Sequence, residues 1–247
     1  TPALDESQER ALKASRWFSD RHQFPEALRY ALVSGSLEES VRIASEGSEA
    51  LLIGQGSASL LRLRRSLPSG LLEKSARLKI VYGWVHAIGG QFRQARMLIN
   101  DLDNGERPEL AGRVDALRAF ILRGEGSVDE ALMVADRALQ AEELSTQGQL
   151  VTQLVRSSAL CAAGKFGDAR EANRIAARLA REAGDAGSEV LAVYAHARIE
   201  LGKGSLKHAE QLLRTGLDTA MNESSRPARV GETRLQLNLV MVLWHQG

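Results

Sequence analysis

The chain has 247 residues, of which 44% are apolar, and its 32 basic and 31 acidic residues leave a formal net charge of +1. Because the two signs are interleaved, no basic stripe of the kind that neutralises phosphates is present, and we expect no nucleic-acid binding by this chain. No apolar run approaches the length of a membrane span and no signal-peptide pattern opens the sequence, so we expect a cytoplasmic protein without membrane association.

Helical periodicity runs through nearly the whole chain and the alternation typical of strands is absent, which predicts an all-α fold. The first helix is expected over residues 6–20. Pro25 suits the first turn of the second helix, which Gly35 ends. The run Ser36–Glu39 has the form of a capping box that opens another helix, and Ser127–Glu130 repeats it downstream.

Residues 54–75 are less regular, since Gly54, Gly56, Pro68 and Gly70 punctuate two short helices, one near 57–66 and one from about 71. From residue 74 onward the periodic segments lengthen and form pairs. The predicted pairs are 74–89 with 91–101, 108–124 with 127–143, 146–163 with 166–182, and 187–202 with 205–221, followed by a last helix over about 227–246 that lacks its partner.

A short signature recurs along the chain: glycine, a large apolar residue two positions later, and alanine five positions later. It occurs as Gly90-Phe92-Ala95, Gly126-Val128-Ala131, Gly164-Phe166-Ala169 and Gly204-Leu206-Ala209, with a degenerate copy, Gly35-Leu37-Ser40. The four glycines follow one another at intervals of 36, 38 and 40 residues. A period in that range is typical of stacked helix pairs, so we predict a right-handed superhelix of tetratricopeptide-like antiparallel pairs, an α-solenoid.

Each position of the signature has a physical interpretation. The glycine closes the first helix of a pair in a left-handed cap, which costs it little. The large residue anchors the second helix, and the alanine permits a close helix crossing. We expect one continuous domain, with short irregular helix pairs over 1–73 and repeats over 74–247. Gly247 would be the turn glycine of a truncated unit, and the chain a fragment of a longer protein.

Motifs that carry catalysis are absent from the sequence. The five histidines show no metal-ligand spacing, no nucleophile elbow occurs, and the single cysteine, Cys161, is expected to be a small packing residue. No phosphate-binding glycine loop and no DNA-reading module can be recognised. We therefore expect no enzyme activity, no metal site and no cofactor in this chain.

A solenoid of this type has an inner wall formed by the first helix of every pair. In tetratricopeptide-like units the residues thirteen, ten, six and three positions before the turn glycine line that wall. The counting rule gathers aromatic and arginine side chains, which suit a sugar, an aromatic acid or a peptide. The predicted ligand-binding residues are Arg77, Trp84, Arg113, Phe120, Arg123, Tyr194 and Arg198. Trp84 and Phe120 also fit a simpler role, packing between neighbouring helices.

The succession of motifs over residues 10–102 resembles a known family. The runs that carry the resemblance are Ala14–Phe18, Phe24–Leu32, Gly35–Ser40, Leu60–Pro68, Tyr82–Trp84 and Gly90–Ala95. Together they are similar to the helical sensor region of the MalT-like, large ATP-dependent LuxR-family transcription activators. The chain departs from the family pattern at His22, which replaces a turn glycine, and at Ser40, which replaces an alanine.

The resemblance implies an effector-sensing and protein-interaction domain of a transcription activator. In such proteins the repeat domain receives an inducer, and the full-length protein then self-assembles; ATP is implied for the full-length protein only. The partner of this chain would be a small-molecule inducer or a protein or peptide. A generic tetratricopeptide-type protein-interaction scaffold is the alternative, and the repeats alone do not decide between the two.

Overall fold

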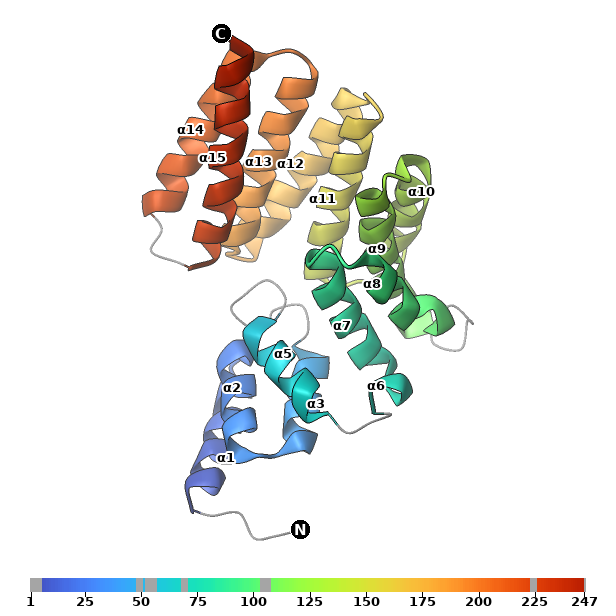
Figure 1. Ribbon diagram of the computed structural model, residues 1–247, viewed down its shortest axis with the longest axis vertical. Coiled ribbons are helices and arrows are strands. Elements are labelled where there is room, and N and C mark those ends of the chain that lie inside the picture. The colour runs from blue at the N-terminus through green and yellow to red at the C-terminus, as the bar shows by residue number, and fades with distance from the viewer. Residues whose placement is uncertain are drawn as a thin grey trace. The chain divides into compact units, whose positions relative to one another are not determined.

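The computed structural model describes residues 6–47, 51, 57–67, 71–102, 108–222 and 226–246, and every regular element among them is a helix (Figure 1). The predicted all-α fold is therefore confirmed for this part of the chain. The chain divides into two compact units, Thr1–Asp103 and Asn104–Gly247. Gly54, Gly56, Pro68, Gly70 and Gly247, to which the sequence analysis gave turn roles, lie outside the described residues.

The first unit begins with three helices, α1 (Glu6–Ser19), α2 (Phe24–Ser34) and α3 (Leu37–Glu46). Two short helices follow, α5 (Ser57–Ser66) and α6 (Leu71–Lys74), at the predicted positions. The unit ends with α7 (Ala76–Ile88), α8 (Phe92–Ile99) and a 3₁₀ turn, η1 (Asn100–Leu102). Helix α1 packs on α2, α2 on α3, and α7 on α8.

Tyr82 lies at the centre of the first unit's core. Its side chain is 1% exposed and packs in one cluster with Leu28, Ile43, Leu60 and Leu63. Its hydroxyl donates a hydrogen bond of 2.9 Å to the carbonyl oxygen of Leu60. The hydrogen bond joins α7 to α5, and the cluster in which the ring packs also includes residues of α2 and α3.

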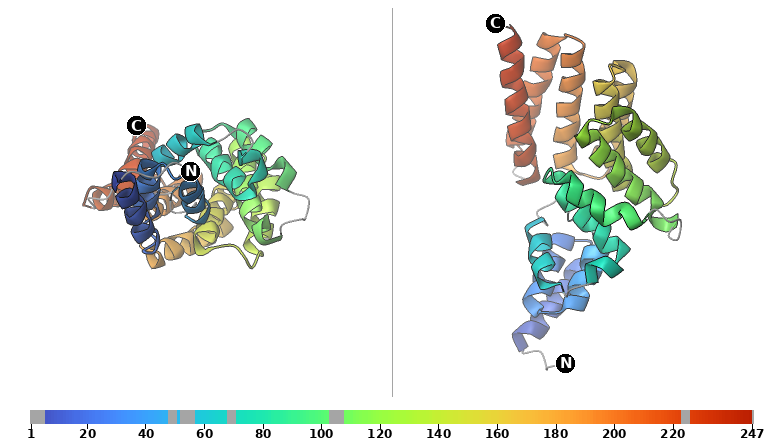
Figure 2. Two further views of the ribbon diagram at one scale, coloured as in Figure 1. Left: turned by 90° about the horizontal axis from the view of Figure 1, so that it is seen from below. Right: turned by 45° about the vertical axis from the view of Figure 1, so that its right-hand side comes forward.

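The second unit contains the three longer pairs and the last helix that the periodicity predicts. The pairs are α9 (Pro108–Glu125) with α10 (Val128–Leu139), α11 (Thr146–Ala162) with α12 (Phe166–Glu182), and α13 (Ala186–Gly202) with α14 (Leu206–Asn222), followed by α15 (Arg226–Gln246). Each helix packs on the next one in the chain, and α9, α11, α13 and α15 also pack on one another in that order (Figures 1 and 2). Sequential pairs that stack in this way are consistent with a helical repeat.

Helix α10 is shorter than the predicted 127–143. It ends at Leu139, and the chain then turns so that Leu144, which is 4% exposed, enters the core. Ser145 follows and caps α11, with its Oγ accepting a hydrogen bond of 3.0 Å from the Gly148 amide. The predicted last turn of α10 is therefore absent. In its place the chain buries the side chain of Leu144 and provides the N-terminal cap of α11.

The glycine of the signature closes the first helix in every copy, as predicted. Gly90, Gly126, Gly164 and Gly204 have φ between 73° and 91°. At each of them, the glycine amide and the amide that follows it bond back to carbonyls of the last helical turn, which is the Schellman arrangement. The second helix then begins at the large apolar residue, and the alanine five positions after the glycine is fully buried.

The predicted cap at Ser127 is wrong. Its side chain makes no cap hydrogen bond, whereas Ser36 accepts one of 3.3 Å from the Glu39 amide. Ser127 has φ −76° and ψ 72°, and the Val128 amide donates to the Gly126 carbonyl at 2.9 Å, which is the geometry of an inverse γ-turn. That backbone conformation differs from the extended one that brings a capping hydroxyl to the helix N-terminus.

The first two helices contain another copy of the signature, in which histidine replaces glycine. His22 has φ 56°, and its amide and that of Gln23 bond to the carbonyls of Ser19 and Phe18 in the Schellman pattern. Helix α2 starts at Phe24, two positions later. Ala27, five positions after His22, is fully buried, so α1 and α2 form a pair of the same design.

A second small residue faces the alanine in each pair. It lies seven positions before the turn residue, on the first helix, and is buried in every copy; these residues are Ser15, Gly83, Ala119, Ser157 and Ala197. In two pairs it is a serine whose hydroxyl donates 2.9 Å to the carbonyl of the signature alanine, Ser15 to Ala27 and Ser157 to Ala169. Two small residues twelve positions apart therefore let the paired helices approach closely.

Replacing His22 with glycine is expected to stabilise the protein by about 1 kcal/mol, because a left-handed conformation costs a side chain with a Cβ roughly 1–2 kcal/mol. Urea unfolding of the variant beside the wild type measures the gain. His22→Ala, which keeps the Cβ, should give no gain. A less stable His22→Gly protein would show that the contact of the imidazole with Phe24, with ring centres 5.8 Å apart, outweighs the backbone strain.

Candidate functional site

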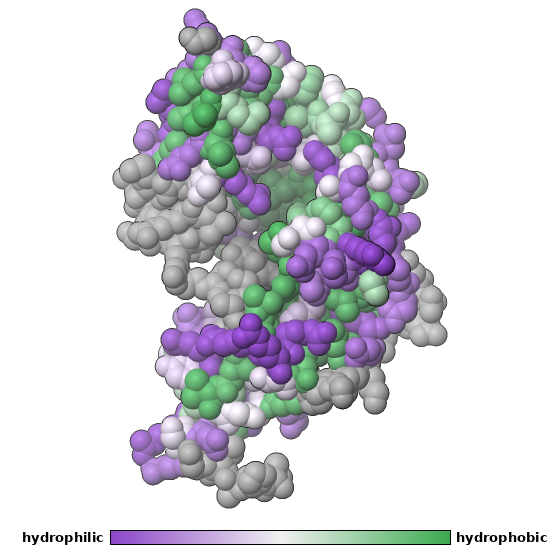
Figure 3. Space-filling view, in the orientation of Figure 1, coloured by the Kyte–Doolittle hydropathy of each residue, from purple (hydrophilic) through white to green (hydrophobic). Residues whose placement is uncertain are grey.

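The first helices of the second unit share one continuous face, called the first-helix face below. It is formed by the counted positions on α9, α11, α13 and α15, which pack side by side. In the upper part of the view in Figure 3, apolar side chains form the floor of a hollow whose margins are more polar. The predicted residues on this face are Arg113, Phe120, Arg123, Tyr194 and Arg198.

Arg123 and Arg198 are brought close together on this face. Arg123 on α9 donates a hydrogen bond of 3.1 Å from Nε to the hydroxyl of Ser158 on α11. Cys161, one turn further along α11, places its Sγ 3.8 Å from the backbone carbonyl of Arg198 on α13. Arg123 and Arg198, which are 75 positions apart in the chain, therefore lie on the two helices that flank α11, and each contacts α11.

The electrostatics of these side chains reflect their partial burial and their proximity. Burial lowers the pKa of Arg123, and the positive charge of Arg198 lowers it further. Burial raises the pKa of Cys161 although both arginines favour its thiolate, so Cys161 is a neutral thiol at pH 7. Arg123 keeps its proton because a guanidinium does not titrate in the physiological range.

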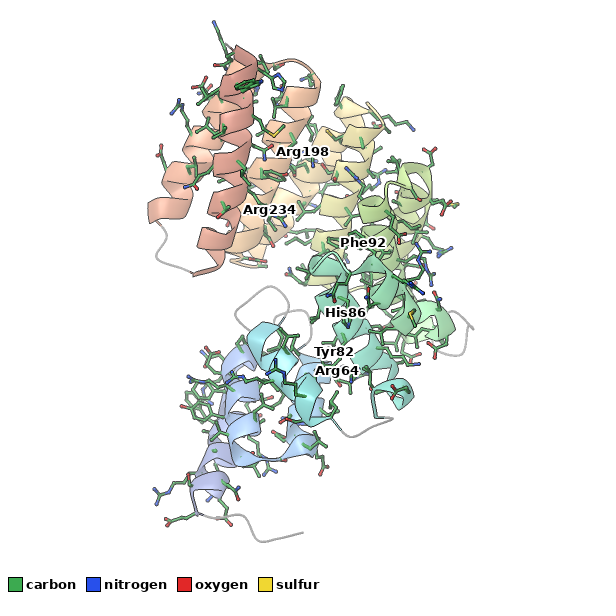
Figure 4. All side chains as sticks on the ribbon, viewed as in Figure 1. Arg64, Tyr82, His86, Phe92, Arg198 and Arg234 are labelled. Carbon is green, nitrogen blue, oxygen red and sulfur yellow. The ribbon has the colours of Figure 1, made fainter. Side chains whose placement is uncertain are left out.

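An open groove of about 580 Å³ lies next to Arg198 on α11, α13 and α15. Cys161, Arg198 and Met241 are counted positions that line it, whereas Asn238 and His245 supply polar groups that the sequence analysis did not select. Figure 4 labels Arg198 on α13 and Arg234 on α15. The sequence-based rule missed Asn238 and His245 because it counts back from Gly247 and selects other positions on α15.

The remaining predicted residues are distributed differently. Arg77, which is exposed, and Trp84, which is half-buried, lie on α7 in the first unit, whereas the other five predicted residues belong to the second unit. Phe120 is half-buried and packs against a core cluster that includes Ala131 and Val155, in line with the simpler packing role considered above. Arg113 is also half-buried on α9. The guanidinium of Arg198 stands 5.9 Å from the ring centre of Tyr194.

A buried carboxylate forms a second polar cluster in the unit. Glu200 on α13 is 2% exposed, and Lys203 Nζ lies 3.2 Å from both of its oxygens. His196 on α13 and His208 on α14 approach the same carboxylate at 3.8 and 3.5 Å. Burial alone would raise the pKa of Glu200, but the bond from Lys203 and the nearby charges of Lys203 and His208 outweigh it, so this pKa lies below its usual value.

Stability is expected to fall as the pH drops from 7.5 to 5.5, because burial and the charge of Arg170 on α12 lower the pKa of His196. The unfolded chain then binds a proton more readily than the folded one, so acidification through the range just below pH 6.5 favours unfolding. Urea unfolding at both pH values measures this loss, which should be smaller in His196→Gln. The depressed pKa of Glu200 adds a separate loss only below about pH 4.5.

His245→Gln provides the matched control, since His245 is exposed and should leave the pH profile unchanged. If His196→Gln loses as much stability as the wild type between pH 7.5 and 5.5, titration of His196 is not the cause. A loss confined to pH values below 4.5 would instead assign the pH dependence to Glu200.

Comparisons with models of known protein families and with curated protein sequences find no match to this chain. Within the described residues, no three or more His, Cys, Asp or Glu side chains are grouped so that they could hold a metal ion. No described helix is long and apolar enough to cross a membrane. The arrangement of side chains on the first-helix face is thus the main structural guide to function.

Proposed function

We propose that this chain is the effector-sensing and protein-interaction domain of a MalT-like LuxR-family transcription activator, built as a right-handed superhelix of tetratricopeptide-like pairs. The observation that carries the proposal is the convergence of Arg123, Ser158 and Arg198 from three successive first helices on one open face. Side chains from stacked units that meet in this way can contact one ligand together. The resemblance over residues 10–102 supplies the reason to expect an inducer.

The proposal explains why the largely apolar first-helix face carries several arginines, which a purely structural face does not need. Tyr194 and Arg198 offer an aromatic ring and a planar cation next to each other, which suits stacking and hydrogen bonding to a small molecule. The groove beside them has the volume of a small-ligand site. Ligand binding there would alter the packing of α13 on α15 and so transmit a signal along the array.

The test is a titration of the chain with sugars, aromatic acids and short peptides by calorimetry, followed by the same titration of Arg198→Ala. An effector of this face should lose affinity at least about tenfold in the variant, because a hydrogen bond to a charged group contributes about 1.5–3 kcal/mol. Arg181→Ala is the matched control, since Arg181 is an exposed arginine on the second helix of its pair. In the longer protein, the same effector should promote self-association.

The alternative function is that of a generic protein-interaction scaffold. The exposed apolar side chains of α15, among them Leu237, Val240 and Trp244, favour it, because large exposed hydrophobic groups are common at protein interfaces. A scaffold should bind a folded or extended protein with contacts spread over several units. Binding of a protein that survives Arg198→Ala, with no small molecule bound by the wild type, would favour the scaffold.

A further inference from the structure

The arginines Arg123 and Arg198 form a cationic pair without a counter-ion in the protein. Within the part of the chain that the structure describes, neither guanidinium lies within ion-pair distance of a carboxylate, whereas two other arginines pair with an aspartate of a neighbouring helix. Arg137 and Arg156 bind Asp115 and Asp136 at 2.6 Å. Arg123 is half-buried and Arg198 is exposed, and a partly desolvated guanidinium beside a second positive charge is unfavourable unless something neutralises it.

The side chains described near the two arginines carry no negative charge, and some of them can donate hydrogen bonds. The Ser158 hydroxyl, which accepts from Arg123, keeps its own proton free to donate. Cys161 stays protonated and does not act as the missing anion. Asn238 and His245 line the adjoining groove with further polar groups. Among the residues that the structure describes, the site therefore presents hydrogen-bond donors and no carboxylate within ion-pair distance of either guanidinium.

We propose that the cationic pair binds an anionic group, a carboxylate or a phosphate, that enters from the groove and lies between Arg123 and Arg198 beside the Ser158 hydroxyl. This inference rests on the proposed role of the first-helix face in effector binding, and it names the chemical class of the effector as an acid. Planar guanidinium groups match the two oxygens of a carboxylate or a phosphate in bidentate geometry, and such charge-assisted bonds are the strong ones. A neutral sugar would leave both charges unmatched.

Cys161 provides a built-in reporter for this site. It is the only cysteine in the chain, it lines the groove, and the charges of both arginines act on its thiol. The experiment measures the rate of alkylation of Cys161 by iodoacetamide, a neutral reagent that does not itself compete for the arginines. The probes are inorganic phosphate and succinate at millimolar concentrations, each compared with sodium chloride at the same ionic strength, which accounts for screening.

Phosphate or succinate is expected to slow alkylation in a saturable way, and the stronger probe identifies which acid the site prefers. Arg123→Gln and Arg198→Gln should each raise the half-protecting concentration at least about tenfold, by the loss of one charge-assisted bond. Arg181→Gln, which removes an equal charge from an exposed position on α12, should protect as the wild type does. Because Arg198 is exposed, Arg198→Gln should fold as the wild type does. It therefore tests the site even if Arg123→Gln is less stable.

The inference is wrong if neither phosphate nor succinate slows alkylation more than sodium chloride does. It is also wrong if both glutamine variants are protected as well as the wild type. Its failure can be distinguished from failure of the proposed function. A neutral sugar that binds the first-helix face, together with no protection by either anion, would leave effector sensing intact. If anion binding depends on both arginines but no effector drives assembly of the longer protein, the anion site is supported and the sensing role is rejected.

Discussion

Replacing Tyr82 with alanine is expected to lower the free energy of unfolding of the first unit by about 3–5 kcal/mol, the range for deletion of a fully buried aromatic ring. The ring belongs to the core cluster that includes Leu28, Ile43, Leu60 and Leu63, so its loss leaves a cavity in this core. The lost bond from its hydroxyl to the Leu60 carbonyl adds to this cost. Urea unfolding followed by the fluorescence of Trp17 and Trp84, both in this unit, measures the change.

Tyr82→Phe separates the two contributions. It removes only the hydroxyl and should cost about 0.5–1.5 kcal/mol, the usual net value of one hydrogen bond. The guanidinium of Arg64, 5.7 Å from the ring centre, stays over an aromatic ring in this variant (Figure 4). If Tyr82→Ala and Tyr82→Phe were equally destabilised, the hydroxyl rather than the ring would be the anchor of α7.

Replacing Ala131 with leucine is expected to destabilise the second unit by about 1–3 kcal/mol through overpacking. Ala131 is fully buried where α10 crosses α9, opposite Ala119, and Val134, Ala135 and Val155 surround it. A leucine has no space at a crossing of two small residues without separating the helices. Thermal unfolding monitored by circular dichroism measures the effect, and Ala169→Leu, at the equivalent crossing with Ser157, should behave alike.

Ala111→Leu is the control for the change in side-chain size, because Ala111 is an exposed position on α9, the helix that Ala131 faces. It should unfold at nearly the wild-type temperature. An Ala131→Leu protein as stable as this control would mean that α9 and α10 do not cross closely at that residue.

The helices and most turns could be predicted from the sequence because their signals are local. The signature spans only six residues, and each of its positions acts on its own turn, so the glycine caps and the buried alanines were both confirmed. The copy at His22 was noticed only as a departure from a family pattern, since glycine served as the marker. The chemical requirement is a left-handed backbone, which histidine also meets at a cost.

The candidate site was predictable only in part. The counting rule placed Arg123 and Arg198 on one face because stacked helices repeat the same register, and their proximity follows from that. That no carboxylate among the described residues lies within ion-pair distance of them depends on which side chains reach the same point from other helices, and no sequence spacing encodes it. Asn238 and His245 line the groove next to Met241, but the rule that counts back from the glycine at the chain end selects only Met241 among these three.

The sequential packing of the second unit also bears on how it folds. Its helix contacts, as far as the structure describes them, join a helix to the next one or to the one after that. Contacts of such short range need little loop closure, so folding should be fast and should begin at more than one pair. Amide exchange should then decrease from the terminal helix α15 towards the interior pair α11 and α12, which has neighbours on both sides. Under force or denaturant, the pairs should open one after another in the order of this gradient, and not all together in a single cooperative event.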